Sequence, residues 1–245
     1  MIRTWIFGML SKISNDAERE RYYFRIHGAE YTYLWGPWMT RYDTFRAYEP
    51  PQEARRFGAV AAYFTEQWFQ SVEDYEGTRS GGVFSTTPWT PTTTEDKESG
   101  AASRPSVLGS ALTAAKPTQD LLGKKPPTPE EMPIIRWLRA FKYPDGVSVE
   151  DGDKWYLQTY AEQAKQQTGL LKYVSYAGIH TSQMHRVDEM WYQDFAAWRK
   201  AVIESPPRYT PPSWEKKEEP FVDMTSTFVR LKPSWDLLRE RPWTP

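Results

Sequence analysis

The feature that most constrains the fold of this chain is an order of elements that occurs twice. Residues 1–77 predict a strand, a helix, two further strands and a short helix, and the same order returns from residue 132. The segment 134–141 (IIRWLRAF) aligns with 2–9 (IRTWIFGM), which pairs Trp137 with Trp5. We interpret the two halves as an internal duplication, based on the matching order more than on residue identities.

The first half is divided by clear start and stop signals. Asn15, with Glu18 three residues later, begins a helix in the manner of a capping box, and Gly36-Pro37 ends it. Thr65 is expected to cap the next helix, at 66–75. Strands are expected at 1–10, 41–48 and 57–64.

The second half repeats these signals. Ser148 with Asp151 again predicts a helix start. The segment from Lys172 (KYVSYAG) aligns with that from Arg41 (RYDTFRA), and residues 191–194 align with 63–66 ahead of a closing helix at 195–204. The strand order of the first half is therefore expected here as well.

A fourth strand would complete the ferredoxin-like βαββαβ unit in each half. Residues 221–231 (FVDMTSTFVRL) supply it in the second half, whereas in the first half only 106–115 has a strand-like composition. The predicted fold class is thus α+β, with two tandem ferredoxin-like units. The expected division is a first unit at 1–77, a Pro/Ser/Thr-rich linker or long loop at 78–131, a second unit at 132–231 and a tail at 232–245.

Composition excludes several classes of function. A net charge of -1 and a pI near 6.4 give no electrostatic reason to bind nucleic acid or an anionic membrane. The chain contains no cysteine, which excludes thiolate catalysis and cysteine-ligated metals. The apolar opening at 1–10 is too short to span a membrane, so we expect a cytoplasmic protein. Pairing of two chains into a homodimer is compatible with the sequence.

The stretch 21–38 (RYYFRIHGAEYTYLWGPW) carries the strongest indication of a site. In a helix, Tyr23, His27, Glu30 and Tyr31 share one face, because they are spaced i, i+4, i+7 and i+8. An imidazole titrates near neutral pH, so His27 is the candidate general acid or base, oriented by Glu30 or Tyr31. The alternative is a helix histidine that is satisfied by a backbone or tyrosine hydrogen-bond partner.

A substrate pocket is expected around these residues. Its walls are predicted to include Trp5, Tyr23, Tyr31, Trp35 and Trp38, because a flat hydrophobic substrate needs aromatic area and few polar groups. Arg41 is a candidate to stabilise an oxyanion, although a solvated strand end is the alternative interpretation. His180, predicted at the end of a strand, is a second polar candidate.

A metal site is the weaker interpretation of the remaining histidines. His180 and His185 are followed by Asp188 and Glu189, and two imidazoles with carboxylates can bind zinc or iron. Their spacing matches no known metal signature, and a polar turn is favoured. We therefore expect neither a metal nor another cofactor.

The capped helix with two aromatics and a histidine (YYFRIHG), set between strands, resembles the EthD-like branch of the dimeric α/β-barrel superfamily. The resemblance covers about residues 1–76 and 132–231. It implies that the two units pair their sheets into one barrel within the chain, with a pocket between each sheet and its helices. The family's helix histidine corresponds to His27, and Tyr160 stands at that position in the second half, which favours a working site in the first unit alone.

The resemblance implies the expected function. Members of the superfamily include cofactor-free monooxygenases, isomerases, decarboxylases, cyclases and lyases for small hydrophobic molecules. We expect a cofactor-independent lyase or isomerase for a small hydrophobic, aromatic catabolic or biosynthetic intermediate. The alternatives are a non-catalytic small-molecule-binding barrel protein and a cofactor-free monooxygenase. No phosphate-binding loop, Rossmann fingerprint or GxSxG elbow is present, and the sequence does not name the substrate.

Overall fold

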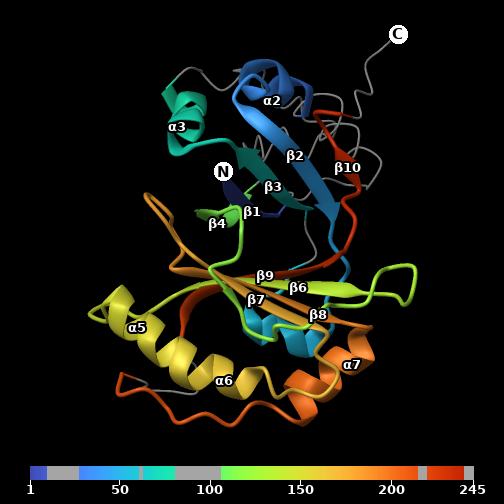
Figure 1. Cartoon of the computed structure of the whole chain (residues 1–245), viewed down its shortest axis with the longest axis vertical. Helices are drawn as coiled ribbons and strands as arrows, with labels where there is room; N and C mark the ends of the chain where they lie inside the picture. Colours follow the sequence, from blue (N-terminus) through green and yellow to red (C-terminus); the bar gives the residue numbers. More distant parts are fainter. Residues whose placement is uncertain (10–27, 61–62, 81–105, 215–219, 240–245) are drawn as a thin grey trace, which may run out of the picture.

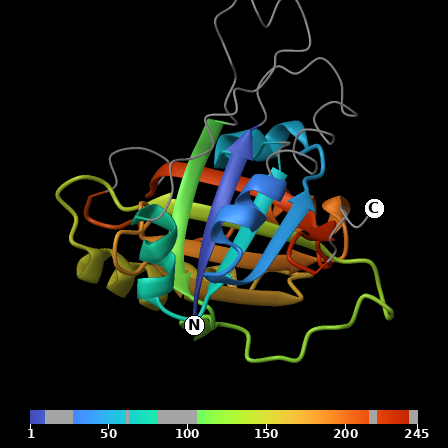
Figure 2. The ribbon, with the colours of Figure 1, turned by 90° about the horizontal axis from the view of Figure 1, so that it is seen from above.

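The chain folds into two antiparallel sheets that face each other, each carrying helices on its outer side (Figure 1). The computed structural model describes residues 1–9, 28–60, 63–80, 106–214 and 220–239. The strands run in the order β10-β2-β3-β1-β4 in the first sheet and β5-β7-β8-β6-β9 in the second. Seen from above, the strands of the two sheets cross at a steep angle (Figure 2). The fold is α+β, with two tandem ferredoxin-like units forming a barrel within one chain, as predicted.

The elements of both units follow the βαββαβ order. The first unit contains β1 (Ile2–Met9), α2 (Gly28–Trp35), β2 (Met39–Arg46), a 3₁₀ helix (Gln52–Phe57), β3 (Tyr63–Phe69), α3 (Val72–Ser80) and β4 (Ser106–Ala114). The short strand β5 (Gln119–Asp120) leads to the second unit. That unit contains β6 (Ile135–Lys142), α5 (Val149–Trp155), a π-helix (Tyr156–Tyr160), α6 (Ala161–Ala164), β7 (Lys172–Ala177), β8 (Arg186–Tyr192), α7 (Phe195–Arg199), a second π-helix (Lys200–Glu204), β9 (Val222–Arg230) and β10 (Trp235–Asp236).

Local sequence signals explain most of these elements. The Ser148 side chain accepts a hydrogen bond from the Asp151 backbone N–H at 3.0 Å, so the predicted cap begins α5.

Strand β4 lies inside the 78–131 segment, at the strand-like residues 106–115 named above as the candidate fourth strand of the first unit. The division of the chain at residues 77 and 131 stays a prediction. Within the described part, no helix has the length and apolar character needed to cross a membrane.

The predicted position of the third strand was wrong. Strand β3 occupies Tyr63–Phe69 and not 57–64, and Thr65 lies within the strand instead of capping a helix. Ser71 is the residue that accepts from the Asp74 N–H, at 3.2 Å, in the first turn of α3. Glu66 caused the error because a carboxylate is unusual inside a strand, where it here forms a buried ion pair.

The alignment of the two halves was also wrong by one residue at the first strand. Ile2 lies opposite Phe69, the last residue of β3, and Ile135 lies opposite Tyr192, the last residue of β8. Trp5 is therefore equivalent to Leu138 and not to Trp137. Since side chains alternate along a strand, this shift places the two tryptophans on opposite faces of their sheets.

The two units exchange their last short strands. Strand β5 follows β4 but pairs with β7 of the second unit, and β10 follows β9 but pairs with β2 of the first. Backbone hydrogen bonds also join the two sheets, among them an equivalent pair from Tyr48 N to Phe228 O at 2.8 Å and from Ile179 N to Leu112 O at 2.9 Å. Each unit thus completes the other, which holds the two sheets in a fixed relation.

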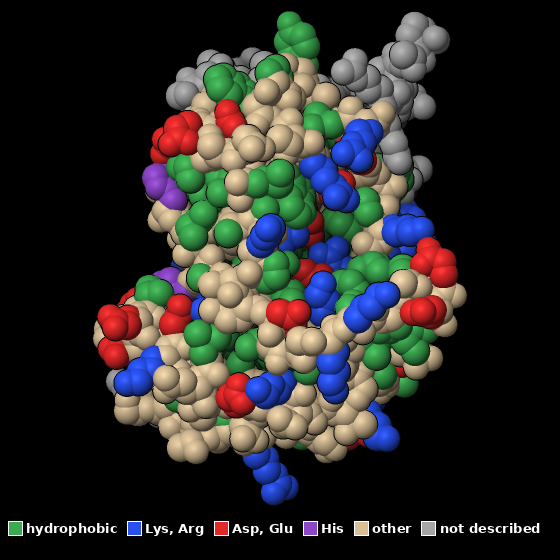
Figure 3. All heavy atoms as spheres, viewed as in Figure 1, with side chains coloured by type: hydrophobic (Ala, Val, Ile, Leu, Met, Phe, Trp, Pro, Cys, Tyr) green, Lys and Arg blue, Asp and Glu red, His purple; other side chains and the backbone are tan. Residues whose placement is uncertain are grey.

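The barrel interior is apolar in the middle and charged at one end. Rings and aliphatic side chains from both sheets fill the middle, among them Trp5, Phe7, Phe45, Phe64, Leu138 and Val187. At the end where β1 and β6 begin, four buried side chains form what we call the charge cluster: Arg3, Glu66, Arg136 and Glu189. Figure 3 shows basic and acidic side chains gathered where the two halves of the molecule meet.

Candidate functional site

The residues predicted to carry acid–base chemistry fall largely outside the described part of the chain. His27 and Tyr23 lie in the segment 10–27, which is not described. Glu30 and Tyr31 belong to α2, but their side chains are not described either. Their catalytic and binding roles stay predictions.

The remaining residues of the predicted pocket do not line one wall. Trp5 is fully buried in the barrel interior, where its indole N–H donates to Thr113 Oγ1 at 2.9 Å. Trp35 is buried in a different cluster, formed by α2 and the helix-facing side of the first sheet. Arg41 is near the charge cluster, with its Nε 2.5 Å from Asp43 Oδ2. Trp5 and Trp35 therefore belong to clusters that pack on opposite faces of the first sheet.

Trp38 and His180 each contact a residue of α3. The Trp38 ring, 43% exposed, covers Gly77 so closely that a Cβ there would be 3.0 Å from it. His180 Nε2 lies 2.7 Å from Glu76 Oε1, which links the β7–β8 hairpin of the second unit to a helix of the first. These two predicted substrate-binding residues are partly exposed, whereas Trp5 is fully buried.

The structure separates the four residues of the metal alternative. His180 contacts α3, while His185 Nδ1 accepts a hydrogen bond from Tyr143 N at 2.9 Å. Asp188 and Glu189 are neighbours in β8, so they point to opposite faces of the second sheet. Among the described residues, no group of three or more potential metal ligands comes together.

A different constellation surrounds Asp188, on the helix-facing side of the second sheet. Asp188 is fully buried and accepts hydrogen bonds from Tyr156 Oη at 2.6 Å, from Ser175 Oγ at 2.9 Å and from Tyr173 Oη at 3.3 Å. Burial and the charge of Asp188 raise the pKa of the Tyr156 hydroxyl, which therefore stays protonated and donates. We use the name Asp188 network for Asp188, its three donors Tyr156, Tyr173 and Ser175, and the residues Arg139 and Tyr160.

Arg139 connects Asp188 to a residue nearer the surface. Its Nη2 donates to Asp188 Oδ2 at 2.6 Å, and its Nη1 donates to the Tyr160 hydroxyl oxygen at 2.9 Å. Burial alone would lower the pKa of Arg139, but the hydrogen bond to Tyr160 and the charge of Asp188 outweigh it and raise the pKa well above the ordinary value. A permanently charged guanidinium thus holds a half-buried phenol.

The backbone that carries the two tyrosines is unusual. Tyr156 and Tyr160 are the first and last residues of a π-helix between α5 and α6, a conformation found frequently at functional sites. Aromatic side chains surround the Tyr160 ring, with centroid distances of 5.1 Å to Phe221, 5.2 Å to Tyr209 and 5.9 Å to Trp155. Tyr160 therefore combines a polarised hydroxyl with an aromatic surrounding, between sheet and helices, where the family resemblance implies a pocket.

The described part of the first unit has no equivalent network. Arg139 lies opposite Asp188 in the second sheet, and the equivalent pair in the first sheet is Ile6 opposite Thr65. The sequence favours a site in the first unit, because Tyr160 stands in the second unit at the position equivalent to His27. The available signal was a charged residue within a strand rich in apolar residues, as at Arg139 in β6 and Asp188 in β8, both of which are buried.

One family model matches part of the chain. A family model described as the chalcone isomerase N-terminal domain matches residues 1–90. No curated protein is similar enough in sequence to match the chain.

Solved structures share the fold at very low sequence identity. One is an anthrone oxidase-like protein, with a TM-score of 0.52 and 10% identity over 94% of this chain and 90% of that chain. Another is a variant of chlorite dismutase from Candidatus Nitrospira defluvii, with a TM-score of 0.52 and 7% identity over 93% of this chain and 90% of that chain. The chain thus shares the dimeric α/β-barrel fold of these proteins.

Proposed function

We propose that the protein is a cofactor-independent isomerase or lyase that moves a proton on a small, hydrophobic, aromatic substrate. The observation that carries this proposal is the Tyr160 hydroxyl, held by Arg139 at 2.9 Å and surrounded by aromatic side chains. Such an arrangement suits a flat substrate with one oxygen that gains negative charge during the reaction.

The hydrogen bonding defines what each group does. Because Arg139 donates to the Tyr160 oxygen, the phenol proton of Tyr160 remains free to be donated to a substrate oxygen. The guanidinium charge favours an oxyanion that develops beside it. Asp188, fully buried, is a positioning residue: it fixes Arg139 and does not reach the substrate.

His27, in the first unit, is the alternative group that we propose to transfer the proton, with Glu30 or Tyr31 orienting it. Its role rests on the sequence alone. The family model that matches residues 1–90 includes His27 and is named for an isomerase, which favours isomerisation over bond cleavage. The anthrone oxidase-like relative is named for an oxidation, so an oxygen-consuming reaction is the alternative to be tested.

The test uses the purified protein with 2′-hydroxychalcone and with an anthrone in an oxygen electrode. The conjugated absorbance of the chalcone falls when its phenol oxygen adds to the double bond and the proton moves to the adjacent carbon. Tyr160→Phe and His27→Ala are compared with Tyr33→Phe, a matched control because Tyr33 is 85% exposed. Loss of one acid or base group is expected to lower kcat by about 10²- to 10⁴-fold while KM changes little. The control is expected to keep its rate, and a chelator is expected to change nothing.

The outcomes separate the hypotheses. A large loss with Tyr160→Phe supports the second unit, and a large loss with His27→Ala supports the first. Oxygen uptake without isomerisation would replace the proposal with a monooxygenase. A ligand that binds tightly but is recovered unchanged would favour a non-catalytic binding protein.

A further inference from the structure

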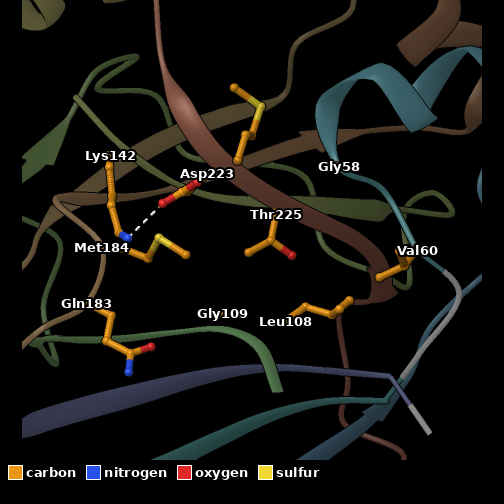
Figure 4. Close-up of a pocket in the computed structure, with 10 residues that line it drawn as sticks. Gly58, Val60, Leu108, Gly109, Lys142, Gln183, Met184, Asp223 and Thr225 are labelled. Carbon is orange, nitrogen blue, oxygen red and sulfur yellow. Dashed lines mark hydrogen bonds and ion pairs between the residues drawn. The ribbon is translucent and has the colours of Figure 1, made fainter. Parts of the chain in front are cut away.

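A pocket of about 700 Å³ opens at the end of the barrel opposite the charge cluster. Arg136 stands near the start of β6, and Lys142, which lines the pocket, is the last residue of that strand. Residues from the starts of β4 and β9 and from two loops line it together with Lys142 (Figure 4). We call it the mouth pocket; the described residues that line it are Gly58, Val60, Leu108, Gly109, Lys142, Gln183, Met184, Asp223, Met224 and Thr225.

Thr225 brings an unsatisfied polar group into this pocket. The residue is 4% exposed, and its hydroxyl oxygen has no hydrogen-bond partner among the described residues. Thr225 belongs to β9, the strand that also carries Asp223, and Figure 4 shows its side chain near the part of β4 that carries Gly109. A buried hydroxyl without a partner loses a hydrogen bond that water would give it, so a ligand oxygen here would restore that bond.

The charges at the rim compensate each other. Lys142 Nζ lies 2.8 Å from Asp223 Oδ2, so the pair presents no net charge to a ligand. Asp223 holds this position with a φ of +49°, a conformation that costs free energy for a residue with a side chain. An ionic ligand would have to separate this pair, whereas a neutral ligand would leave it intact.

The other walls are apolar and adaptable. Met184, Met224 and Leu108 contribute flexible or aliphatic surface, and methionine in particular adjusts its shape to flat rings. Gly109 allows a close approach, since a Cβ there would lie 2.6 Å from Met184 Cε and 2.8 Å from Thr225 Cγ2. The volume falls within the range of small-molecule sites.

We infer that the mouth pocket binds an uncharged small molecule with an apolar ring system and one hydrogen-bonding oxygen, such as a phenol or alcohol. The oxygen bonds to Thr225 and the rings lie against the methionines. This site is separate from the Asp188 network, which lies on the other face of the second sheet, and does not depend on the proposed reaction.

The experiment measures binding of three matched two-ring probes by calorimetry: 1-naphthol, naphthalene and 1-naphthoate. Naphthol is expected to bind more tightly than both others. Thr225→Val keeps the side-chain shape and removes the hydroxyl, so it should weaken naphthol binding about three- to tenfold and leave naphthalene unchanged. Thr168→Val, an exposed threonine in the loop before β7, is the matched control.

The position of the ligand is read from methyl resonances. With 13C-methyl methionine labelling, naphthol should shift the signals of Met184 and Met224 among the seven methionines. Leu108→Trp, which fills the rim, should lower affinity at least tenfold. Tighter binding of naphthoate, an unchanged naphthol affinity in Thr225→Val, shifts confined to other methionines, or no binding of any probe would each overturn the inference.

Discussion

Replacing Glu189 by glutamine is expected to destabilise the protein strongly, and by an amount that depends on pH. Glu189 Oε1 accepts from Arg136 Nε at 3.0 Å and from the Trp191 indole N–H at 2.6 Å. Both side chains of the ion pair are about 5% exposed. Glutamine would leave the buried Arg136 with Glu66 as its one remaining carboxylate in the charge cluster.

The magnitude follows from the pKa of the carboxyl group. Burial would raise the pKa of Glu189, but the charges of Arg136 and Arg3 outweigh it and lower the pKa from 4.5 to about 2. That difference corresponds to roughly 3 kcal/mol of folding free energy. Because the pKa is lower in the folded state, this contribution is fully present above pH 4.5 and is lost as the pH falls toward 2.

Urea unfolding followed by tryptophan fluorescence measures both effects. At pH 7 the Glu189→Gln variant is expected to lose about 3 kcal/mol relative to wild type. At pH 3.5 the gap should be smaller by roughly 1 kcal/mol, since wild type has then lost part of the same contribution. Glu162→Gln, which removes a surface ion pair with Lys165, is the matched control and should cost less than about 1 kcal/mol.

Two results would refute this reasoning. A loss below about 1 kcal/mol at pH 7 would mean that the charges of the cluster do not stabilise the fold beyond their desolvation cost. A gap that stays constant between pH 7 and pH 3.5 would mean that Glu189 is not the ionised group that this mechanism requires.

Two further predictions concern the backbone and a histidine. Burial lowers the pKa of His185, whose Nδ1 accepts from the Tyr143 backbone N–H, so stability is expected to fall as the pH drops below about 6.5. His185→Asn should flatten this pH dependence in urea titrations; an unchanged slope would contradict it. Gly58→Ala should lower Tm more than Gly123→Ala, although both have a positive φ, because only at Gly58 would the new Cβ meet an obstacle, the Met224 carbonyl oxygen at 2.1 Å. Equal shifts of Tm in the two variants would show that conformational strain alone decides the cost.

The elements of the second unit could be predicted closely because their signals are local. Ser148 caps α5 as expected, and β6 and β9 begin and end within about one residue of the expected strands. In the first unit β3 was misplaced, because Glu66 was read as a helix start. A strand can bury a carboxylate if an arginine from a neighbouring strand pairs with it, and that partner is 63 residues away in the chain.

The sequence by itself determined the fold class, the repeated order of elements and the aromatic composition from which a site can be built. It also named His27, whose role stays a prediction. Only the tertiary structure decided which charged residues act together. Arg139 and Asp188 are 49 residues apart in the chain. Tyr160, which contacts Arg139, is the last residue of a π-helix that no local signal predicted. Cross-strand register sets these contacts, and a shift of one residue would turn each of them to the other face of the sheet.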